Sequence, residues 1–508
     1  MDTIAPQVYD VIILGSGLAG LYAALNLSRG GPDLRLLMLS KQSPDVSGSS
    51  LAQGGVAAVI EQEHDSFALH VEDTLVAGNY KNDVAAVEVL VTEGPEDVRR
   101  VMELGVEFDK TPQGALSMTL EGGHSRRRIV HHADQTGKEM VDKLLPHVLA
   151  LPNLTLLEDA MACTAQKIPG GFLLRVLSGG ETTQVACRFL LLCTGGVGQV
   201  YRYTTNPAVS TGDGVRLAYE LGAQIKNLSF VQFHPTAFAG GREQQTGCEG
   251  AGRESCFLIS EALRGEGAYL LNHAGERFMH RYDTRLELAP RDVVSRAIMR
   301  EAERTGREQF YLDIRRRGKD FILGRFPTIA EACLARGVDV AADWIPVFPC
   351  QHYLMGGVNV DLHSRTSVPG LYAAGECAHT GLHGGNRLAS NSLPEALVFS
   401  RRAAEDILAA AGQSAQRLSL PPPTVPQPPS PPAWSPPPDL RGQIQRIMQK
   451  AYFVFPNAEV LPGAARELRA LYERMRGGAC AMRREQAETL SLACVAALIL
   501  EDAEAQLL

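Results

Sequence analysis

The stretch VYDVIILGSGLAGLYAALNL, residues 8–27, decides the fold of this 508-residue chain. Val8 to Leu14 is an apolar run that predicts a β-strand, and apolar residues recur at helical spacing from Leu18 to Leu27. Between them stands a GxGxxG turn, whose glycines permit a sharp reversal, close approach of a pyrophosphate and tight helix packing. The residues predicted to contact a dinucleotide here are Gly15, Ser16, Gly17, Leu18, Ala19 and Gly20.

Three later segments bear on which dinucleotide the turn binds. The second predicted strand, Leu34 to Leu39, ends at Ser40 and Lys41, where an acidic residue usually holds a ribose hydroxyl. The loop SGSSLAQGG, residues 47–55, has small residues suited to close approach of a flat ring. Ser392, with a proline two residues later, predicts a helix start that can stabilise the negative charge of a reduced flavin. Together these segments favour FAD.

The rest of the chain predicts an α/β protein in several parts. Apolar runs at Phe189 to Cys193 and Leu371 to Ala374 each precede a glycine turn, which predicts a discontinuous Rossmann-like FAD-binding domain. We place its two parts at residues 1–228 and 346–415, around an inserted α+β capping domain at 229–345. A proline-rich linker at 416–438 follows, and then a helical C-terminal domain at 439–508, in which apolar residues recur at helical spacing.

Composition excludes several classes of function. The net charge of -8 gives no attraction to nucleic acid, and the short cluster Arg126 to Arg128 is typical of a solvated turn. No apolar run is long enough to span a bilayer, and no secretory leader precedes the first strand, so we expect a cytoplasmic protein. The ten cysteines are scattered without a CxxC pair, which predicts reduced thiols and no metal site.

Nine motifs, read in order, resemble those of the L-aspartate oxidase family within the succinate dehydrogenase and fumarate reductase flavoprotein superfamily. The resemblance covers nearly the whole chain. The motifs are GSGLAGL (15–21), AQGG (52–55), TGDG (211–214), QFHPT (232–236), EALRGEGAYL (261–270), LAPRDVV (288–294), HYLMGGV (352–358), GEC (375–377) and GLHGGNRLASNSL (381–393).

The resemblance implies a noncovalent FAD site. In membrane-complex relatives a histidine joined covalently to the flavin stands where this chain has Gly48. Glu376 is expected to bind the ribityl chain of FAD. Beyond the first turn, the implied FAD contacts are Lys41, Gly48, Ser49, Ser50, Leu51, Ala52, Gln53, Gly54, Gly55, Asp213, Glu376, Ser392 and Leu393.

The resemblance also implies a site for L-aspartate. A C4 dicarboxylate needs cationic or hydrogen-bond-donating groups for both carboxylates. Glu121 matches the residue that orients the amine, Arg291 matches the proton donor or acceptor, and Glu261 with Arg264 resembles a proton relay. The residues expected to hold the two carboxylates are His234, Arg291, His352 and Arg387, with Ser260 as a further hydroxyl donor.

The implied reaction is hydride transfer from the substrate Cα to flavin N5, which gives iminosuccinate. The electrons would pass to O2, giving hydrogen peroxide, or to fumarate, and quinolinate synthase would take the imine on the route to NAD.

Two other functions stay open at this point. One is a dehydrogenase or fumarate reductase subunit that docks on an iron-sulfur partner, and the other is a flavin-binding scaffold without catalysis. Two stretches depart from the family pattern, an apparent insertion at Gly240 to Arg253 and the tail segment Met448 to Phe455.

Overall fold

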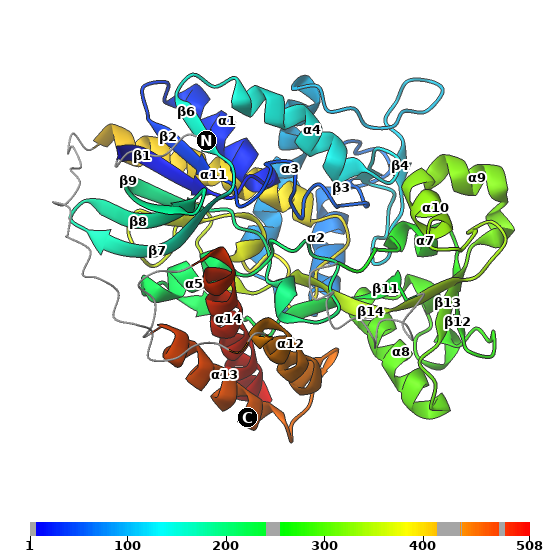
Figure 1. The fold of residues 1–508 in the computed structure, drawn as a ribbon. Coiled ribbons are helices and arrows are strands. Elements are labelled where there is room, and N and C mark those ends of the chain that lie inside the picture. Colours follow the sequence, from blue (N-terminus) through cyan, green and yellow to red (C-terminus); the bar gives the residue numbers. More distant parts are fainter. Residues whose placement is uncertain (1–6, 240–254, 414–436, 438, 477–482, 508) are drawn as a thin grey trace.

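The computed structural model describes residues 7–239, 255–413, 437, 439–476 and 483–507, and Figure 1 shows how their helices and strands are arranged. The apparent insertion at 240–253 lies outside these ranges, as does most of the predicted proline-rich linker. Two larger β-sheets, which differ in size and strand direction, organise the described part of the chain. One is a seven-stranded sheet that contains the N-terminal strand, and the other is a four-stranded sheet to one side of it.

The seven-stranded sheet grows from the apolar N-terminal run. β1 (Gln7–Leu14) pairs in parallel with β2 (Leu36–Leu39) on one side and with β9 (Glu181–Leu192) on the other. β16 (Leu371–Ala373) also pairs in parallel with β9, so two widely separated parts of the chain share this sheet. The sheet is completed by β6 (Leu154–Leu157), parallel to β2, and by the antiparallel strands β7 (Ala160–Ile168) and β8 (Gly171–Ser178) beside β9.

Both faces of this sheet are buried. Val11 and Ile13 point into one core, while Ile12 and Leu14 point into another on the opposite face, because successive side chains of a strand alternate. A strand covered on both sides reads as a continuous apolar run, which is what the sequence has at this point. The helices around the first core are α1 (Leu18–Gly30), α3 (Val84–Glu103), α4 (Thr136–Leu149) and α11 (Ser392–Gln413).

Short elements connect these layers. Three of the strands form one small sheet, β3 (Val56–Ala57), β5 (Ile129–Val130) and β4 (Met118–Thr119), and three form another, β10 (Ile225–Lys226), β15 (Gly357–Asn359) and β17 (Ala378–His379). The helices among them are α2 (Phe67–Ala77), α5 (Asp213–Glu220), and the 3-10 turns η1 (Gly198–Val200) and η5 (Gly375–Cys377).

The four-stranded sheet has a core of its own. Its order is β11 (Val231–Phe238), β14 (Ile345–Leu354), β13 (Phe310–Asp313) and β12 (Tyr269–Asn272), all antiparallel. β14 runs on past residue 345, the predicted end of the capping domain, and the domain boundaries stay predictions. The helices beside this sheet are α7 (Glu261–Gly265), α8 (Arg291–Thr305), α9 (Lys319–Arg325) and α10 (Pro327–Leu334), with 3-10 turns η2 (Met279–Arg281), η3 (Leu286–Leu288) and η4 (Arg315–Arg317).

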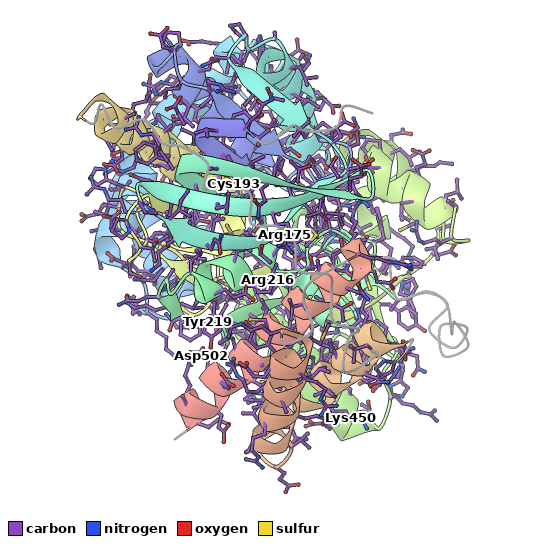
Figure 2. The ribbon with its side chains drawn as sticks, turned by 60° about the vertical axis from the view of Figure 1, so that its left-hand side comes forward. Arg175, Cys193, Arg216, Tyr219, Lys450 and Asp502 are labelled. Atoms are coloured by element: carbon purple, nitrogen blue, oxygen red, sulfur yellow. The ribbon has the colours of Figure 1, made fainter. Side chains whose placement is uncertain are left out.

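The C-terminal helices are part of the main core. Ile444, Leu468 and Val495, three of the periodic apolar residues in the sequence, are buried in the same core as Ile12 of β1. Figure 2 shows α14 lying against the part of the molecule that carries Arg216. The elements of this region are α12 (Leu440–Ala451), the strands β18 (Tyr452–Phe453) and β19 (Phe455–Pro456), α13 (Leu461–Arg476) and α14 (Arg484–Leu507). These layers confirm the predicted α/β class with an inserted α+β part and a helical C-terminal part.

Candidate active site

A cavity of about 390 Å³ extends from the turn between β1 and α1 to the first residues of α7 and α8. The glycines of the turn differ in what a side chain at each position would contact. Gly15 has a φ of +108°, and a Cβ on it would lie 2.1 Å from the carbonyl oxygen of Cys193. A Cβ on Gly20 would lie 2.0 Å from the carbonyl oxygen of Gly15, so both glycines are needed to pack the turn. Gly17 lines the cavity, and because it has no side chain a ligand can approach its backbone closely.

The wall at this end fits the diphosphate and adenosine of FAD. α1 begins at Leu18, which lines the cavity and whose backbone N-H donates to Oγ of Ser49 over 3.2 Å. The N-cap residue Gly17 adds no side-chain cap, so the positive end of the helix dipole lies at the cavity. The Oγ atoms of Ser16 and Ser40 lie 2.8 Å apart, and Lys41 forms an ion pair of 2.7 Å with Asp213.

Most predicted cofactor residues line this cavity. Gly20 packs behind the turn, and Ser50 closes its own loop through hydrogen bonds with Ser47, so these two do not reach the wall. The predicted residues at the wall are Gly15, Ser16, Gly17, Leu18, Ala19, Ser40, Lys41, Gly48, Ser49, Leu51, Ala52, Gln53, Gly54, Gly55, Asp213, Glu376, Ser392 and Leu393.

Glu376 lines the cavity. Its Oε1 accepts a hydrogen bond of 3.1 Å from the backbone N-H of Leu354. Burial raises the pKa of Glu376 to about 7. A Cβ on Gly196 would lie 2.2 Å from Oε1, so a glycine is needed for the carboxyl group to sit here.

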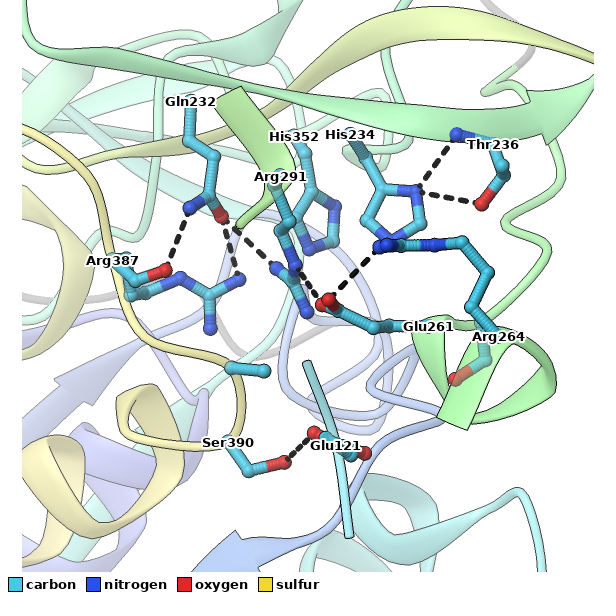
Figure 3. Close-up of polar contacts among 12 residues, drawn as sticks. Glu121, Gln232, His234, Thr236, Glu261, Arg264, Arg291, His352, Arg387 and Ser390 are labelled. Carbon is cyan, nitrogen blue, oxygen red and sulfur yellow. Dashed lines mark hydrogen bonds and ion pairs between the residues drawn. The ribbon is translucent and has the colours of Figure 1, made fainter. Parts of the chain in front are cut away.

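At the other end of the cavity two arginines converge on one glutamine, as Figure 3 shows. Arg291, the first residue of α8, donates from Nη1 to Oε1 of Gln232 over 2.9 Å. Arg387 donates from Nη2 to the same oxygen over 3.2 Å and from Nη1 to Ser392 over 2.8 Å. The guanidinium of Arg387 also lies 4.2 Å from the ring centroid of Tyr353. Burial, followed by the charge of Arg291, lowers the pKa of Arg387 to about 10.

Two histidines lie beside these arginines. The rings of His234 and His352 are 5.1 Å apart at their centroids. Burial, with the charge of Arg291 next, holds the pKa of both well below the usual range, so both imidazoles are neutral at pH 7. The backbone N-H of Thr236 donates to Nδ1 of His234 over 3.2 Å, which places the proton of that ring on Nε2. Nε2 is buried and has no hydrogen-bond partner among the described residues, so it can donate to a ligand.

Glu261 connects two arginines at the start of α7. Its Oε2 accepts from Nε of Arg291 over 2.5 Å, and its Oε1 forms an ion pair of 2.9 Å with Arg264. Burial opposes ionisation of Glu261, but the charges of Arg264 and Arg291 outweigh it and lower its pKa. Arg264 is behind the cavity wall, where burial lowers its pKa. Ser260 lines the cavity and caps α7 by accepting from the backbone N-H of Ala262.

Glu121 lines the same cavity and has a different environment. It is 3% exposed, and Oγ of Ser390 donates to its Oε2 over 2.6 Å. No cationic side chain in the described ranges forms an ion pair with it. Burial is the main reason that its pKa is raised. A Cβ on Gly122 would lie 2.3 Å from Oε1 of Glu261, so this glycine lets the two carboxylates share one region of the wall.

Sequence reasoning missed Gln232, Ser390 and Tyr353, although all three belong to recognised motifs. Neutral polar or aromatic residues in a motif give no charge signal, and their role is visible only through the arginines and the glutamate that they contact. The structure brings every predicted substrate residue, and both Arg291 and Glu261, to one end of the cavity.

The expectation of a solvated turn at Arg126 to Arg128 is wrong for its last residue. Arg128 is fully buried and forms ion pairs with Asp65 over 2.7 Å and with Asp73 over 2.5 Å. These partners lie far back in the sequence, so the local run of arginines gave no sign of them. Arg128 also donates to Nδ1 of His124, which stands three residues after Glu121.

None of the helices in the described ranges has the length and apolar character needed to cross a bilayer. The same ranges contain no group of three or more His, Cys, Asp or Glu side chains placed to hold a metal ion.

Comparisons with known proteins agree with an FAD site in this cavity. The FAD binding domain family model matches residues 10–393. An L-aspartate oxidase of Streptomyces coelicolor is 44% identical over 92% of this chain and 80% of its own length. One from Clostridium perfringens is 43% identical over 79% of this chain and 87% of its own length.

Among solved structures, an E. coli quinol fumarate reductase chain aligns with a TM-score of 0.83 and 29% identity. The alignment covers 99% of this chain and 88% of that one. The family match, the identity to these relatives and the fold give one conclusion: the chain belongs to the L-aspartate oxidase family of FAD-binding oxidoreductases.

Proposed function

We propose that this protein oxidises L-aspartate to iminosuccinate with noncovalently bound FAD, and that O2 or fumarate takes the electrons. The observation that carries the proposal is Glu121, a buried carboxylate without a cationic partner in the described chain, at the cavity end that holds Arg291 and Arg387. Burying an unpaired carboxylate is costly, so the site favours a ligand that brings its own positive charge.

The two carboxylates of the substrate are matched by the donors at that end. Arg387 offers a planar guanidinium held by Ser392 and Gln232, and Nε2 of His234 is free to donate. We assign these residues, with His352, Ser260 and Arg291, to carboxylate binding. The ammonium group of L-aspartate then pairs with Glu121, and succinate and fumarate lack that group.

Proton movement is assigned to Arg291, Glu261 and Arg264. As a cation, Arg291 can take up a proton from the substrate only as it gives one of its own to a neighbouring base. Glu261 contacts both guanidinium groups, so a proton taken up at Arg291 can be passed inward through the carboxylate. Arg264 donates to the carbonyl oxygen of Glu287, which fixes the inner end of the relay.

When bound, FAD supplies the acceptor for the hydride that leaves the substrate Cα. The chain's own part is to hold it through the α1 N-terminus, the 47–55 loop and Glu376. Gly48 carries no group that can bond to a flavin, and no atom of the described structure lies within 4 Å of a Cβ placed there. Acid precipitation should therefore release all of the flavin into solution.

We place the enzyme in the cytoplasm, at the first step of NAD synthesis through quinolinate. Iminosuccinate is an imine that water hydrolyses, so a quinolinate synthase must consume it soon after release.

The experiment that tests the function uses flavin absorbance. Purified protein with FAD is mixed anaerobically with L-aspartate and, separately, with succinate. Bleaching by L-aspartate, with iminosuccinate trapped as a product, is the expected result. Bleaching by succinate alone would reassign the chain to the succinate dehydrogenase type, and bleaching by neither would make it a flavin-binding scaffold.

A further inference from the structure

The residues that follow β2 contact α14, which lies near the C-terminus. In a Rossmann unit this position faces the adenosine ribose and usually carries an acidic residue, but here Ser40 and Lys41 occupy it. Lys41 lines the cavity, and its ammonium lies 3.3 Å from Oε1 of Glu488 in α14. The C-terminal helical region thus reaches the cofactor end of the cavity.

The ammonium of Lys41 is held on three sides. It donates to Oγ1 of Thr211 over 2.7 Å and pairs with Asp213 over 2.7 Å, and Glu488 is its third partner. An ammonium has three N-H donors, so these contacts fix its position fully. Thr211 donates in turn to the Asp213 carboxylate over 3.0 Å. Burial raises the pKa of Asp213, but Lys41 outweighs burial, so the carboxylate has a lowered pKa and stays ionised.

The same face of α14 also contacts the 211–216 segment, at Arg216 and at Gly212. Oγ of Ser491 accepts from Nε of Arg216 over 2.9 Å. A Cβ on Gly212 would lie 2.8 Å from Val495, so this glycine lets the segment rest directly on the helix. Residues 488, 491 and 495 follow the spacing of one helical stripe. Figure 2 shows Arg216 beside this helix.

We propose that α14 is part of the FAD site, with Glu488 as a positioning residue that holds Lys41 and, through it, Asp213 at the ribose end of the cavity. Glu488 does not line the cavity, and among its cationic partners Lys41, Arg484 and Arg441 it is Lys41 that does, so Glu488 acts through the lysine. FAD binding and docking of the C-terminal helices are then coupled, and each strengthens the other by the same factor.

The test is the FAD dissociation constant, measured by flavin fluorescence quenching on purified full-length apoprotein. Glu488→Gln should weaken FAD about fivefold, because a charge-assisted contact is lost. The matched control is Glu501→Gln in the same helix, whose carboxylate pairs with Arg469 of α13 and is remote from Lys41. It should leave FAD affinity unchanged. An equal loss in both variants, or none in Glu488→Gln, overturns the proposal.

Two further measurements separate positioning from general destabilisation. In a Lys41→Met background, Glu488→Gln should have no additional effect on FAD, and an undiminished effect would contradict action through the lysine. FMN lacks the adenosine half of FAD, so Glu488→Gln should leave its affinity unchanged. A parallel fall in FMN affinity would refute the assignment to the ribose end. These outcomes do not depend on whether L-aspartate is the substrate.

Discussion

At the scale of single residues, the proposed preference for L-aspartate rests on Glu121. Replacing Glu121 by Gln keeps the volume and removes the charge that would pair with an ammonium group. We expect kcat/KM for L-aspartate to fall on the order of 100-fold, while the turnover of fumarate changes little. Steady-state kinetics with both substrates measures this. Equal losses with L-aspartate and fumarate would show that Glu121 does not recognise the amine.

Ser390→Ala is the matched, milder variant. It keeps the Glu121 charge and removes the hydroxyl that donates to Oε2. We expect kcat/KM for L-aspartate to fall about tenfold less than in Glu121→Gln, because only one hydrogen bond is lost. The turnover of fumarate should again change little.

Sequence predicted the charged residues of the site better than their neutral partners. His234, Arg291 and Arg387 could be named because they stand in motifs that resemble those of the family, and because a dicarboxylate needs such groups. Gln232 could not, since its role consists of accepting from two arginines that meet only in the fold. Arg128 was misjudged for a related reason, because its aspartate partners are distant in sequence.

At the scale of elements, the short helix α7 and the start of α8 form one functional unit. Glu261 in α7 contacts Arg291 in α8, and these two residues stand thirty positions apart. The sequence predicted the pairing of Glu261 with Arg264, which are one helical turn apart, and the contact with Arg291 required the tertiary structure.

Glu261→Gln tests this unit. The amide keeps the shape and the contact with Arg291 but cannot accept a proton, so we expect kcat to fall on the order of 100-fold with little change in KM. Stopped-flow reduction of the flavin by L-aspartate measures the chemical step directly. A variant that loses affinity and keeps its rate would show that Glu261 binds and does not relay.

Strands of the seven-stranded sheet were predicted where an apolar run precedes a turn. Such runs lie at the ends of β1 and β9 and along β2 and β16, and the structure has a strand at each. The antiparallel strands β7 and β8 were not predicted, since they carry mixed burial and no glycine motif marks them. The helices of the C-terminal region were predicted from periodicity, but their burial against the main sheet was not.

At the scale of the whole molecule, that burial changes how the protein should unfold. Ile12 of β1, Leu468 of α13 and Val495 of α14 belong to one core, whereas the four-stranded sheet has a separate core around Phe310. Elements that share a core unfold together. Calorimetry of the apoprotein should therefore give no separate transition for the C-terminal helices, and hydrogen exchange in α14 should be as slow as in β1. Early exchange throughout α14 would contradict this.

The unpaired carboxylate of Glu121 also has a consequence for the proton balance of the enclosed site. The charged groups assigned above to substrate binding and proton movement are Arg264, Arg291, Arg387, Glu121 and Glu261, and together they carry one net positive charge when ionised. L-Aspartate carries one net negative charge and neutralises the site, whereas fumarate carries two. Because the pKa of Glu121 is already raised, fumarate should drive one proton onto it. Fumarate should therefore bind more tightly as the pH falls and L-aspartate less tightly, and calorimetry in buffers of different ionisation enthalpy should detect proton uptake with fumarate alone. One side chain would then let a single cavity accept both an amino acid and its unsaturated diacid, each at electrical neutrality.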